Sequence, residues 1–248
     1  MALVFDNVCK AFHSERADRD NVLENISFTT QRGEFICLLG KSGCGKTTIL
    51  NMVAGLIFPT TGKVTLDGAP ITHPGPDRSY IFQEPALFPW LNVIDNVKFG
   101  MKMQDIPKEE REEKALRYLE MVKLSEYKAY RVHEISGGMK QRVALARALA
   151  VDSDILLMDE PFAALDNHTK DEIRKHLLEI WGITQKTILF VTHSIEEAFL
   201  LADKVVLFTS RPATIKKIFC LSRPRDLASE EYLSMMDEVK AHLAREAD

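Results

Sequence analysis

One short segment near the start of the chain has the residue types and spacing of a phosphate-binding loop. Gly40, Gly45, Lys46 and Thr47 match the pattern G-x-x-x-x-G-K-[ST] and follow an apolar run, residues 35–39, that predicts a buried strand. Glycines let backbone N–H groups turn toward phosphate oxygens, and a following helix adds the positive end of its dipole. Lys46 can then reach the β- and γ-phosphates, while the Thr47 hydroxyl can hold Mg²⁺. The segment therefore predicts nucleotide binding. Its other members expected to line the phosphates are Ser42, Gly43, Cys44 and Thr48.

Two adjacent carboxylates, Asp159 and Glu160, come directly after the apolar run 155–158. The run predicts a buried strand, and burying unpaired carboxylates is costly, so these acids should face a metal ion or a polar cleft. Asp159 suits the second coordination shell of Mg²⁺, whereas Glu160 is placed to polarise a water that attacks a phosphate. Both could instead belong to an ordinary surface turn, but the phosphate loop in the same chain favours the catalytic interpretation.

Ser136, Gly137 and Gly138 stand before an Ala-rich segment, residues 139–150, whose composition predicts a helix. Ser136 suits the N-cap position, and glycines allow another group to approach the backbone closely. Simple capping is the alternative. However, one serine is enough to cap a helix, and two further glycines lower stability unless something must come close. These residues therefore predict a second anion-binding helix start.

Gln83 and His193 each follow a predicted strand, residues 79–82 and 188–192. Parallel α/β proteins bind ligands at the carboxyl ends of their strands, so both side chains are candidates for the nucleotide site. Taken singly, each also has a plain structural explanation, because an amide or an imidazole at a strand end commonly bonds a neighbouring loop.

In their order along the chain, these segments resemble the motifs of one family. The chain is similar to the ATP-binding subunits of ABC transporters over nearly its whole length. The resemblance identifies residues 40–48 with the Walker A loop, 135–141 with the signature motif and 155–160 with Walker B. It also identifies Gln83 with the Q-loop and His193 with the switch histidine. With the D-loop at residues 164–166, six ordered motifs form a specific pattern, which favours the functional interpretation of Gln83 and His193.

Two further residues are interpreted through the resemblance alone. Residues 164–166 take the place of the D-loop, so Asp166 is expected at the nucleotide site, and Phe12 takes the place of the aromatic side chain that stacks on adenine. The signature departs from the usual Leu-Ser-Gly-Gly-Gln in two positions. Ile135 replaces leucine with a similar volume, whereas Met139 replaces glutamine and removes any polar contact of that side chain.

The resemblance implies that two subunits pair head to tail, with each ATP between the Walker A loop of one and the signature of the other. The catalytic residues it implies are Lys46, Gln83, Glu160 and His193. The residues it implies for Mg²⁺ are Thr47, Gln83 and Asp159. From the opposite subunit, the site would be completed by Ser136, Gly137, Gly138 and Asp166. Because every motif is intact, a homodimer is the simplest expectation.

Strand-like and helical segments alternate along most of the chain, which predicts an α/β protein with a mostly parallel sheet. The expected strands are residues 3–8, 22–29, 35–39, 63–68, 79–82, 155–158, 188–192 and 204–208, with a polar loop at 14–21. The expected helices are residues 49–56, 107–124, 139–150 and 170–181, and a closing helix with the apolar stripe Tyr232, Met236, Val239 and Leu243.

The resemblance specifies this architecture further, as a P-loop, RecA-like core with a small antiparallel β subdomain and an inserted helical subdomain, the ABC ATPase fold. The ATP-binding domain is expected to span residues 1–221, with the helical subdomain at about 85–150. Residues 222–226 are expected to form a linker, so that 222–248 would be a short linker and helix packing on the domain.

Composition limits the classes of function. The chain has 248 residues, of which 46% are hydrophobic and 27% charged, and a net charge of -4, which is ordinary for a soluble protein and gives no sign of a nucleic-acid surface. The first residues lack a signal peptide's basic start, and no apolar run reaches the roughly 18 residues of a membrane span. Four cysteines without metal or disulfide spacing favour reduced thiols. If the protein serves a membrane, another chain must therefore cross it, and the resemblance implies a peripheral protein on the cytoplasmic side of the plasma membrane.

The segment after Gln83, residues 84–93, is rich in large apolar groups. Phe88 and Trp90 would either bind a cytoplasmic helix of a transmembrane permease or pack within the subunit. Together with the short tail, this segment resembles the importer branch for nitrate, taurine and sulfonates, whose members also work with a substrate-binding protein. The favoured function is therefore an importer ATPase for a small anion.

Two other functions agree less well with the sequence. A soluble ABC-type ATPase of DNA repair or translation would be expected to carry coiled-coil insertions, Cys-rich zinc modules or a second ATPase domain, and the sequence contains none of these. A P-loop kinase or GTPase would not explain Ser136, Gly137 and Gly138, and a GTPase would be expected to carry Asn-Lys-x-Asp.

Overall fold

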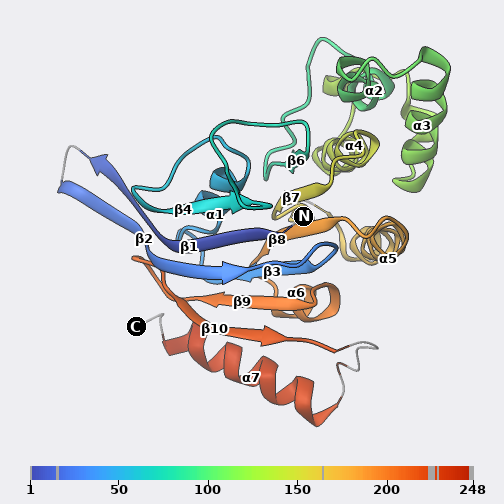
Figure 1. Ribbon diagram of the computed structural model, residues 1–248. Coiled ribbons are helices and arrows are strands. Elements are labelled where there is room, and N and C mark those ends of the chain that lie inside the picture. Colours follow the sequence, from blue (N-terminus) through green and yellow to red (C-terminus); the bar gives the residue numbers. More distant parts are fainter. Residues whose placement is uncertain (1, 15–16, 164, 223–226, 228, 246–248) are drawn as a thin grey trace. The chain divides into compact units, whose positions relative to one another are not determined.

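The computed structural model describes residues 2–14, 17–163, 165–222, 227 and 229–245 (Figure 1). The chain divides into two compact units. Unit 1 contains Met1–Gly75 and Gln185–Asp248, and unit 2 contains Pro76–Thr184. Both units combine helices with strands, which confirms the predicted α/β class.

Unit 1 begins with an antiparallel sheet in the order β2-β1-β4-β5. Its strands are β1 (Leu3–Ser14), β2 (Ala17–Thr29), β4 (Thr61–Leu66) and β5 (Ala69–Pro70). The predicted polar loop at 14–21 is wrong over Ala17 to Asn21, because Phe12 pairs with Asp20 and Ser14 with Ala17 across a long hairpin. Cross-strand backbone pairing does not depend on the polarity of the side chains, so polar composition alone misleads here.

The second part of unit 1 is a mainly parallel group of strands. β3 (Phe35–Leu39) pairs in parallel with β8 (Thr187–Thr192) and β9 (Lys204–Phe208), and β10 (Ile215–Cys220) runs antiparallel to β9. All residues of β3 and β8 are buried, as expected for parallel strands covered on both faces. The described helices of this unit are α1 (Lys46–Val53), α6 (Ile195–Leu201) and α7 (Glu230–Arg245).

The closing helix α7 packs on the chain itself, as its stripe predicts. Tyr232, Met236 and Val239 are buried, and the Tyr232 ring meets the Phe199 ring of α6 edge-on with the centroids 6.4 Å apart. Most of the predicted linker at 222–226 lies outside the described residues. The domain boundaries proposed from the sequence therefore stay a prediction.

Unit 2 joins a short parallel strand pair to a group of helices. β6 (Arg78–Ile81) pairs with β7 (Ile155–Asp159). The helices are α2 (Val93–Met103), α3 (Lys108–Met121), α4 (Gly137–Ala150) and α5 (Asn167–Thr184). Helices α2, α3 and α4 all contact one another. In α2, Gly100 allows close packing, since a Cβ there would lie 2.3 Å from Val151 Cγ2. None of the described helices of either unit is both long and apolar enough to cross a membrane.

Candidate functional site

The predicted phosphate loop connects β3 to α1. Two of its glycines have backbone conformations that suit glycine, with φ of 79° at Gly43 and 116° at Gly45. A Cβ on Gly45 would lie 2.7 Å from Leu23 Cδ2 and 3.0 Å from Val22 Cγ1, so the hairpin strand β2 leaves no room for a side chain. The neighbouring Cys44 is buried. The chain's own packing therefore determines the shape of this loop.

Lys46 lies inside this loop and is 5% exposed. Its ammonium nitrogen donates to the carbonyl oxygens of Gly40 at 2.7 Å and Lys41 at 2.8 Å. These carbonyls hold the cation at the start of α1 and partly satisfy its hydrogen-bonding groups. A buried ammonium with only neutral acceptors is well suited to an anionic ligand, because a phosphate supplies the missing opposite charge.

The first turn of α1 is open to a ligand. Gly45 occupies the N-cap without a side-chain hydrogen bond, and the first turn contains no acidic residue. Its N–H groups and the positive end of the helix dipole are therefore free of a local carboxylate. Thr47 is exposed and Thr48 half-buried at this helix end, and Ser42 and Gly43 are exposed in the loop before it.

His193 lies at the same edge of the parallel strands as this loop. The register pairs Leu39, the last residue of β3, with Thr192, the last residue of β8. The Thr192 hydroxyl donates to the buried carboxylate of Glu197 at 2.6 Å and accepts from the backbone N–H of Ser194 at 3.0 Å. These bonds hold the backbone on both sides of the exposed His193.

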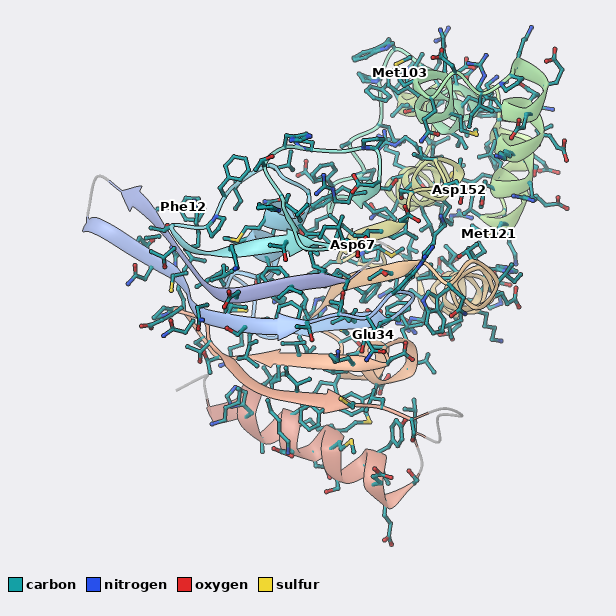
Figure 2. All side chains as sticks on the ribbon, in the orientation of Figure 1. Phe12, Glu34, Asp67, Met103, Met121 and Asp152 are labelled. Carbon is teal, nitrogen blue, oxygen red and sulfur yellow. The ribbon has the colours of Figure 1, made fainter. Side chains whose placement is uncertain are left out.

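Phe12 is on β1 and is 40% exposed (Figure 2). The Lys10 ammonium lies 4.7 Å from the centre of its ring and also donates to the Phe58 carbonyl at 2.8 Å. An exposed ring of this kind offers a flat apolar surface to a base. Its role in stacking on adenine stays a prediction.

In unit 2, the parallel strands β6 and β7 place Gln83 and the two acids at a common edge. Ile81 pairs with Met158 at the ends of the strands. Asp159 is buried, whereas Glu160 is half-buried and Gln83 exposed. Burial raises the pKa of the Tyr80 hydroxyl, and the Asp159 carboxylate raises it further by its negative charge. Tyr80 therefore stays neutral beside the acid.

Glu160 has a φ of 46°, in the left-handed region that residues other than glycine seldom adopt. Its carbonyl oxygen accepts from the N–H of Ala163 at 3.1 Å, which closes a turn directly after β7. Such strained backbone often occurs where a functional side chain must point in a particular direction.

Ser136 is the N-cap of α4, as predicted, and its hydroxyl accepts from the Met139 N–H at 3.3 Å. The first turn of this helix contains no acidic residue. In the described part of the chain, no atom outside the adjoining helix backbone lies within 4 Å of the place where a Gly137 Cβ would stand. Nothing in the subunit's own packing therefore requires this glycine.

Asp166 caps the following helix, α5. Its carboxylate accepts from the backbone N–H of Thr169 at 3.0 Å and from the Thr169 hydroxyl at 2.7 Å, and these bonds lower the pKa of Asp166. Ala164, the first residue of the predicted D-loop, lies outside the described residues. The sequence did not indicate this capping role, although Asp three residues before Thr is a recognisable N-terminal pattern.

The donors predicted for Mg²⁺ are a hydroxyl, an amide and a carboxylate, all oxygen ligands of the kind that this ion prefers. Among the residues that the structure describes, no three His, Cys, Asp or Glu side chains gather into a ready-made metal site. A donor set of one hydroxyl, one amide and one carboxylate fits Mg²⁺ bound with a nucleotide, since Mg²⁺ then takes few protein ligands and completes its shell with phosphates and water.

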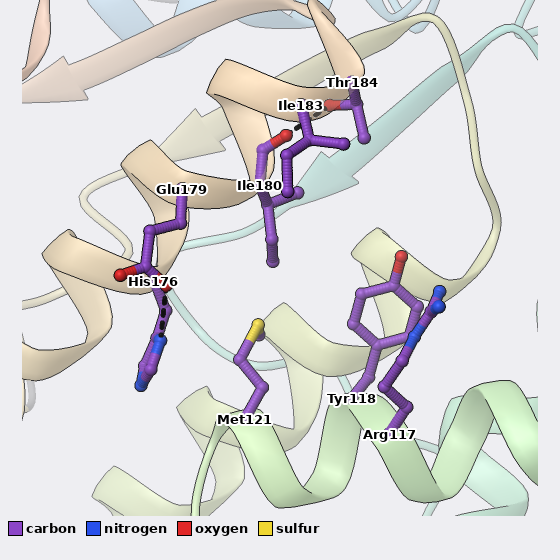
Figure 3. A pocket seen from close by; sticks show the side chains of 8 residues that line it. All are labelled: Arg117, Tyr118, Met121, His176, Glu179, Ile180, Ile183 and Thr184. Carbon is purple, nitrogen blue, oxygen red and sulfur yellow. Dashed lines mark hydrogen bonds and ion pairs between the residues drawn. The ribbon is translucent and has the colours of Figure 1, made fainter.

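Among the described residues of unit 2, some line grooves that include none of the predicted nucleotide residues. One, of about 310 Å³, lies between α3 and α5 (Figure 3). Another, of about 390 Å³, adjoins α2 and the start of α3 and includes Leu91 and Phe99.

Thus each unit gathers part of the predicted site at one edge of its strands. In unit 1, the phosphate loop and His193 share an edge. In unit 2, Gln83, Asp159 and Glu160 share another, and Ser136 begins α4. These are the elements expected of a nucleotide-hydrolysing cassette. Residues 23–163 also match the model of the family described as ABC transporter.

The chain belongs to the ABC transporter family. It is 45% identical to the taurine import ATP-binding protein TauB of Burkholderia thailandensis over 93% of this chain and 89% of that protein. It is 44% identical to the nitrate import ATP-binding protein NrtD of Synechococcus elongatus over 99% of this chain and 89% of that protein.

A solved structure confirms the ABC ATPase fold. The dimeric structure of the ATP-binding cassette MJ0796, in a post-hydrolysis state bound to ADP and phosphate, matches with a TM-score of 0.81. It shares 29% sequence identity and covers 89% of this chain and 99% of that chain. ATP binding by this chain follows from its membership of the family.

Proposed function

We propose that this chain is the ATP-hydrolysing subunit of an importer for a small anion, and that it works through a separate membrane subunit. The observation that carries the proposal is the presence of two helix starts suited to phosphate, at α1 and α4, in a chain similar to import ATPases. TauB is named for taurine and NrtD for nitrate, which supports a small anionic or zwitterionic solute as the cargo.

The two helix starts are best explained by a head-to-tail dimer. Each ATP would lie between the phosphate loop of one copy and residues 136–138 of the other, with Asp166 beside it. The open surroundings of Gly137 support this, because a phosphate from a second copy can approach the backbone there. The related cassette MJ0796 is dimeric in its ADP-bound structure. ATP would then hold the dimer closed, and hydrolysis would reopen it.

Within one subunit, the chemistry can be assigned to a few side chains. Lys46 binds and neutralises phosphate oxygens, and residues 42–48 supply N–H donors to them. Glu160 polarises the attacking water, and its unusual backbone conformation supports that directed role. His193 would contact the γ-phosphate, and the hydrogen bonds of the neighbouring Thr192 to Glu197 and Ser194 support a fixed backbone there.

Mg²⁺ would be held by Thr47, Gln83 and Asp159. When bound, it supplies positive charge to the β- and γ-phosphate oxygens. Phe12 is proposed to stack on the adenine.

The partner in the membrane is proposed to be a permease that docks on the segment after Gln83. Trp90 is 67% exposed, and its ring lies against Phe88 with the ring centres 5.5 Å apart. The Phe88 ring in turn lies against the Phe99 ring of α2, with the ring centres 4.2 Å apart. Phe88 thus packs within the subunit while Trp90 remains available to a partner. The subunit would lie on the cytoplasmic face of the membrane and serve a substrate-binding protein indirectly.

Purification of the tagged chain from gently solubilised native membranes tests this function. A multi-span membrane protein in stoichiometric yield, identified by mass spectrometry, is the expected companion, and its solute identifies the cargo. Recovery of the chain with ribosomes or DNA and without a membrane protein would contradict the importer and favour a soluble ABC-type ATPase.

A further inference from the structure

Residues 82–92, here called the connecting segment, join β6 to α2 and contain Gln83, Phe88 and Trp90 (Figure 1). Although the segment is irregular, one side chain of α4 holds its middle. The guanidinium of Arg147 donates from Nη1 to the Ala86 carbonyl at 2.9 Å and from Nη2 to the Pro85 carbonyl at 3.1 Å. This bidentate contact fixes two successive peptide groups from a point 61 residues away in the chain.

Arg147 is half-buried, and the two acceptors that its guanidinium contacts are neutral carbonyls. Burial lowers the pKa of its guanidinium, and the Cζ atom lies 5.5 Å from the centre of the Phe88 ring. The planar fork has a fixed geometry, so it recognises one arrangement of the two carbonyls. Ala86 has a φ of 44°, which places its peptide group in an orientation that a residue other than glycine seldom adopts without support.

Two buried amides hold the flanks of the same segment. Gln141 of α4 donates from Nε2 to the Phe82 carbonyl at 3.4 Å. Asn96 of α2 accepts from the Phe88 N–H at 2.8 Å and donates to the Phe88 carbonyl at 3.2 Å. Gln83 is thus exposed between two anchored points, at Phe82 and at Pro85.

We propose that Arg147 is a positioning residue that makes the connecting segment move together with α4. The proposal rests on the function proposed above, in which a permease contacts this segment and Ser136 contacts a nucleotide of the opposite subunit. Ser136 and Arg147 lie on one helix, and a rise of 1.5 Å per residue separates them by about 16 Å. A displacement applied at Trp90 then reaches the Ser136 end of α4 through a rigid helix.

The helix offers a matched control in Arg142. This residue lies five positions earlier on α4 and also donates to a backbone carbonyl, that of Val122, from Nη1 at 3.1 Å. Replacing either arginine by methionine removes a guanidinium that bonds the backbone and leaves an unbranched apolar side chain. Only Arg147→Met releases the connecting segment.

Hydrogen exchange in the isolated, full-length chain tests the anchor without a permease. The amides of Phe88 and Leu91 are suitable probes, because each donates a hydrogen bond within this region. Arg147→Met should speed their exchange by about tenfold or more, since two bonds from a charged donor are lost. Arg142→Met should leave it unchanged. Equal exchange rates in Arg147→Met and Arg142→Met would contradict the proposal that Arg147 holds the connecting segment.

Transport by the complex with its permease tests the coupling. Arg147→Met should bind ATP as wild type does, because the phosphate loop is unaltered, while permease-stimulated hydrolysis and solute moved per ATP fall about tenfold. Arg147→Lys keeps the charge but lacks the planar guanidinium. Its permease-stimulated hydrolysis and its solute moved per ATP should lie between those of the wild type and of Arg147→Met. Unchanged coupling in Arg147→Met, or an equal loss in Arg142→Met, would overturn the proposal.

The two measurements also separate this inference from the proposed function. If no permease associates with the wild-type chain, the importer fails, and the exchange rates of Phe88 and Leu91 still decide whether Arg147 anchors the segment. If Arg147→Met fails to fold, Arg147→Lys provides the same comparison with the stem and charge preserved.

Discussion

The N-termini of α1 and α4 resemble each other locally and differ in their surroundings. Helix α1 follows a glycine-rich loop, α4 begins with two glycines of its own, and neither helix has an acidic residue in its first turn. At α1, however, the chain encloses the loop, since a Cβ on Gly45 would lie 2.7 Å from Leu23 and Lys46 is buried. At α4, Ser136 is exposed and a Cβ on Gly137 would meet no described atom within 4 Å beyond the adjoining helix backbone.

This difference shows which glycines serve the subunit's own fold. The glycine at α1 is required by the packing of this chain, so its replacement should damage the folded subunit. The glycine at α4 has no such requirement, so its replacement should matter only when a second molecule approaches. The comparison therefore separates a site that the chain builds by itself from one that needs a partner.

Glu160→Gln should have the largest effect on turnover. It should also keep the N-termini of α1 and α4 of opposite subunits together around the bound ATP. Removal of the carboxylate that polarises water should lower ATP hydrolysis by about 10²–10⁴-fold. Nucleotide binding should remain, so the variant should form a dimer in MgATP, measured by light scattering. A variant that stays monomeric in MgATP would contradict the composite site.

Gly45→Ala should damage the enclosed region. The left-handed φ of 116° costs about 1–3 kcal/mol for a residue with a side chain, and the contact with Leu23 about 1–3 kcal/mol more. We expect a lower free energy of unfolding in denaturant titrations and loss of ATP binding by the monomer. Wild-type stability and affinity would show that the loop is not shaped by β2.

Gly137→Ala should spare the monomer and damage the shared site. Alanine is a better helix former than glycine by about 1 kcal/mol, so the free energy of unfolding should be equal or higher. ATP affinity of the monomer should be unchanged. Hydrolysis should fall by about 10²-fold, because the added methyl group displaces the approaching phosphate by about 1 Å. Undiminished hydrolysis in Gly137→Ala would contradict the proposal that the N-terminus of α4 completes the nucleotide site of a second subunit.

Phe12→Ala should have the smallest effect. Loss of a stacked ring weakens binding by about 0.5–1.5 kcal/mol, which corresponds to roughly 2–13-fold in the dissociation constant for ATP. Titration calorimetry on the monomer measures it, and Phe12→Tyr, which keeps the ring, serves as the control. Equal affinity in the alanine and tyrosine variants would place the adenine elsewhere.

Local patterns predicted the elements that carry the proposed site well where one short segment contains the whole signal. The apolar run before the phosphate loop is β3, and Ser136 is the N-cap of α4, as expected from the sequence. Prediction failed where long-range pairing decides the structure. The polar residues 17–21 form part of β2, and the strand β10 was not predicted, because pairing with β1 and β9 holds them extended.

The residues that position the site were harder to find. Arg147 and Gln141 lie in an Ala-rich helix and give no motif of their own. Their partners are backbone carbonyls at Phe82, Pro85 and Ala86, which every residue possesses. Contacts to the backbone leave no complementary side chain in the sequence, so only the folded structure reveals them.

By itself, the sequence determined the family, the nucleotide chemistry and the starts of the two helices that we propose to bind phosphate, because glycines, caps and apolar runs act through neighbours a few residues away. The tertiary structure decided which glycine is enclosed and which is open, and which arginine of α4 holds the connecting segment. These distinctions depend on contacts between residues far apart in the chain, such as Leu23 with Gly45 and Ala86 with Arg147, which form only when the backbone folds.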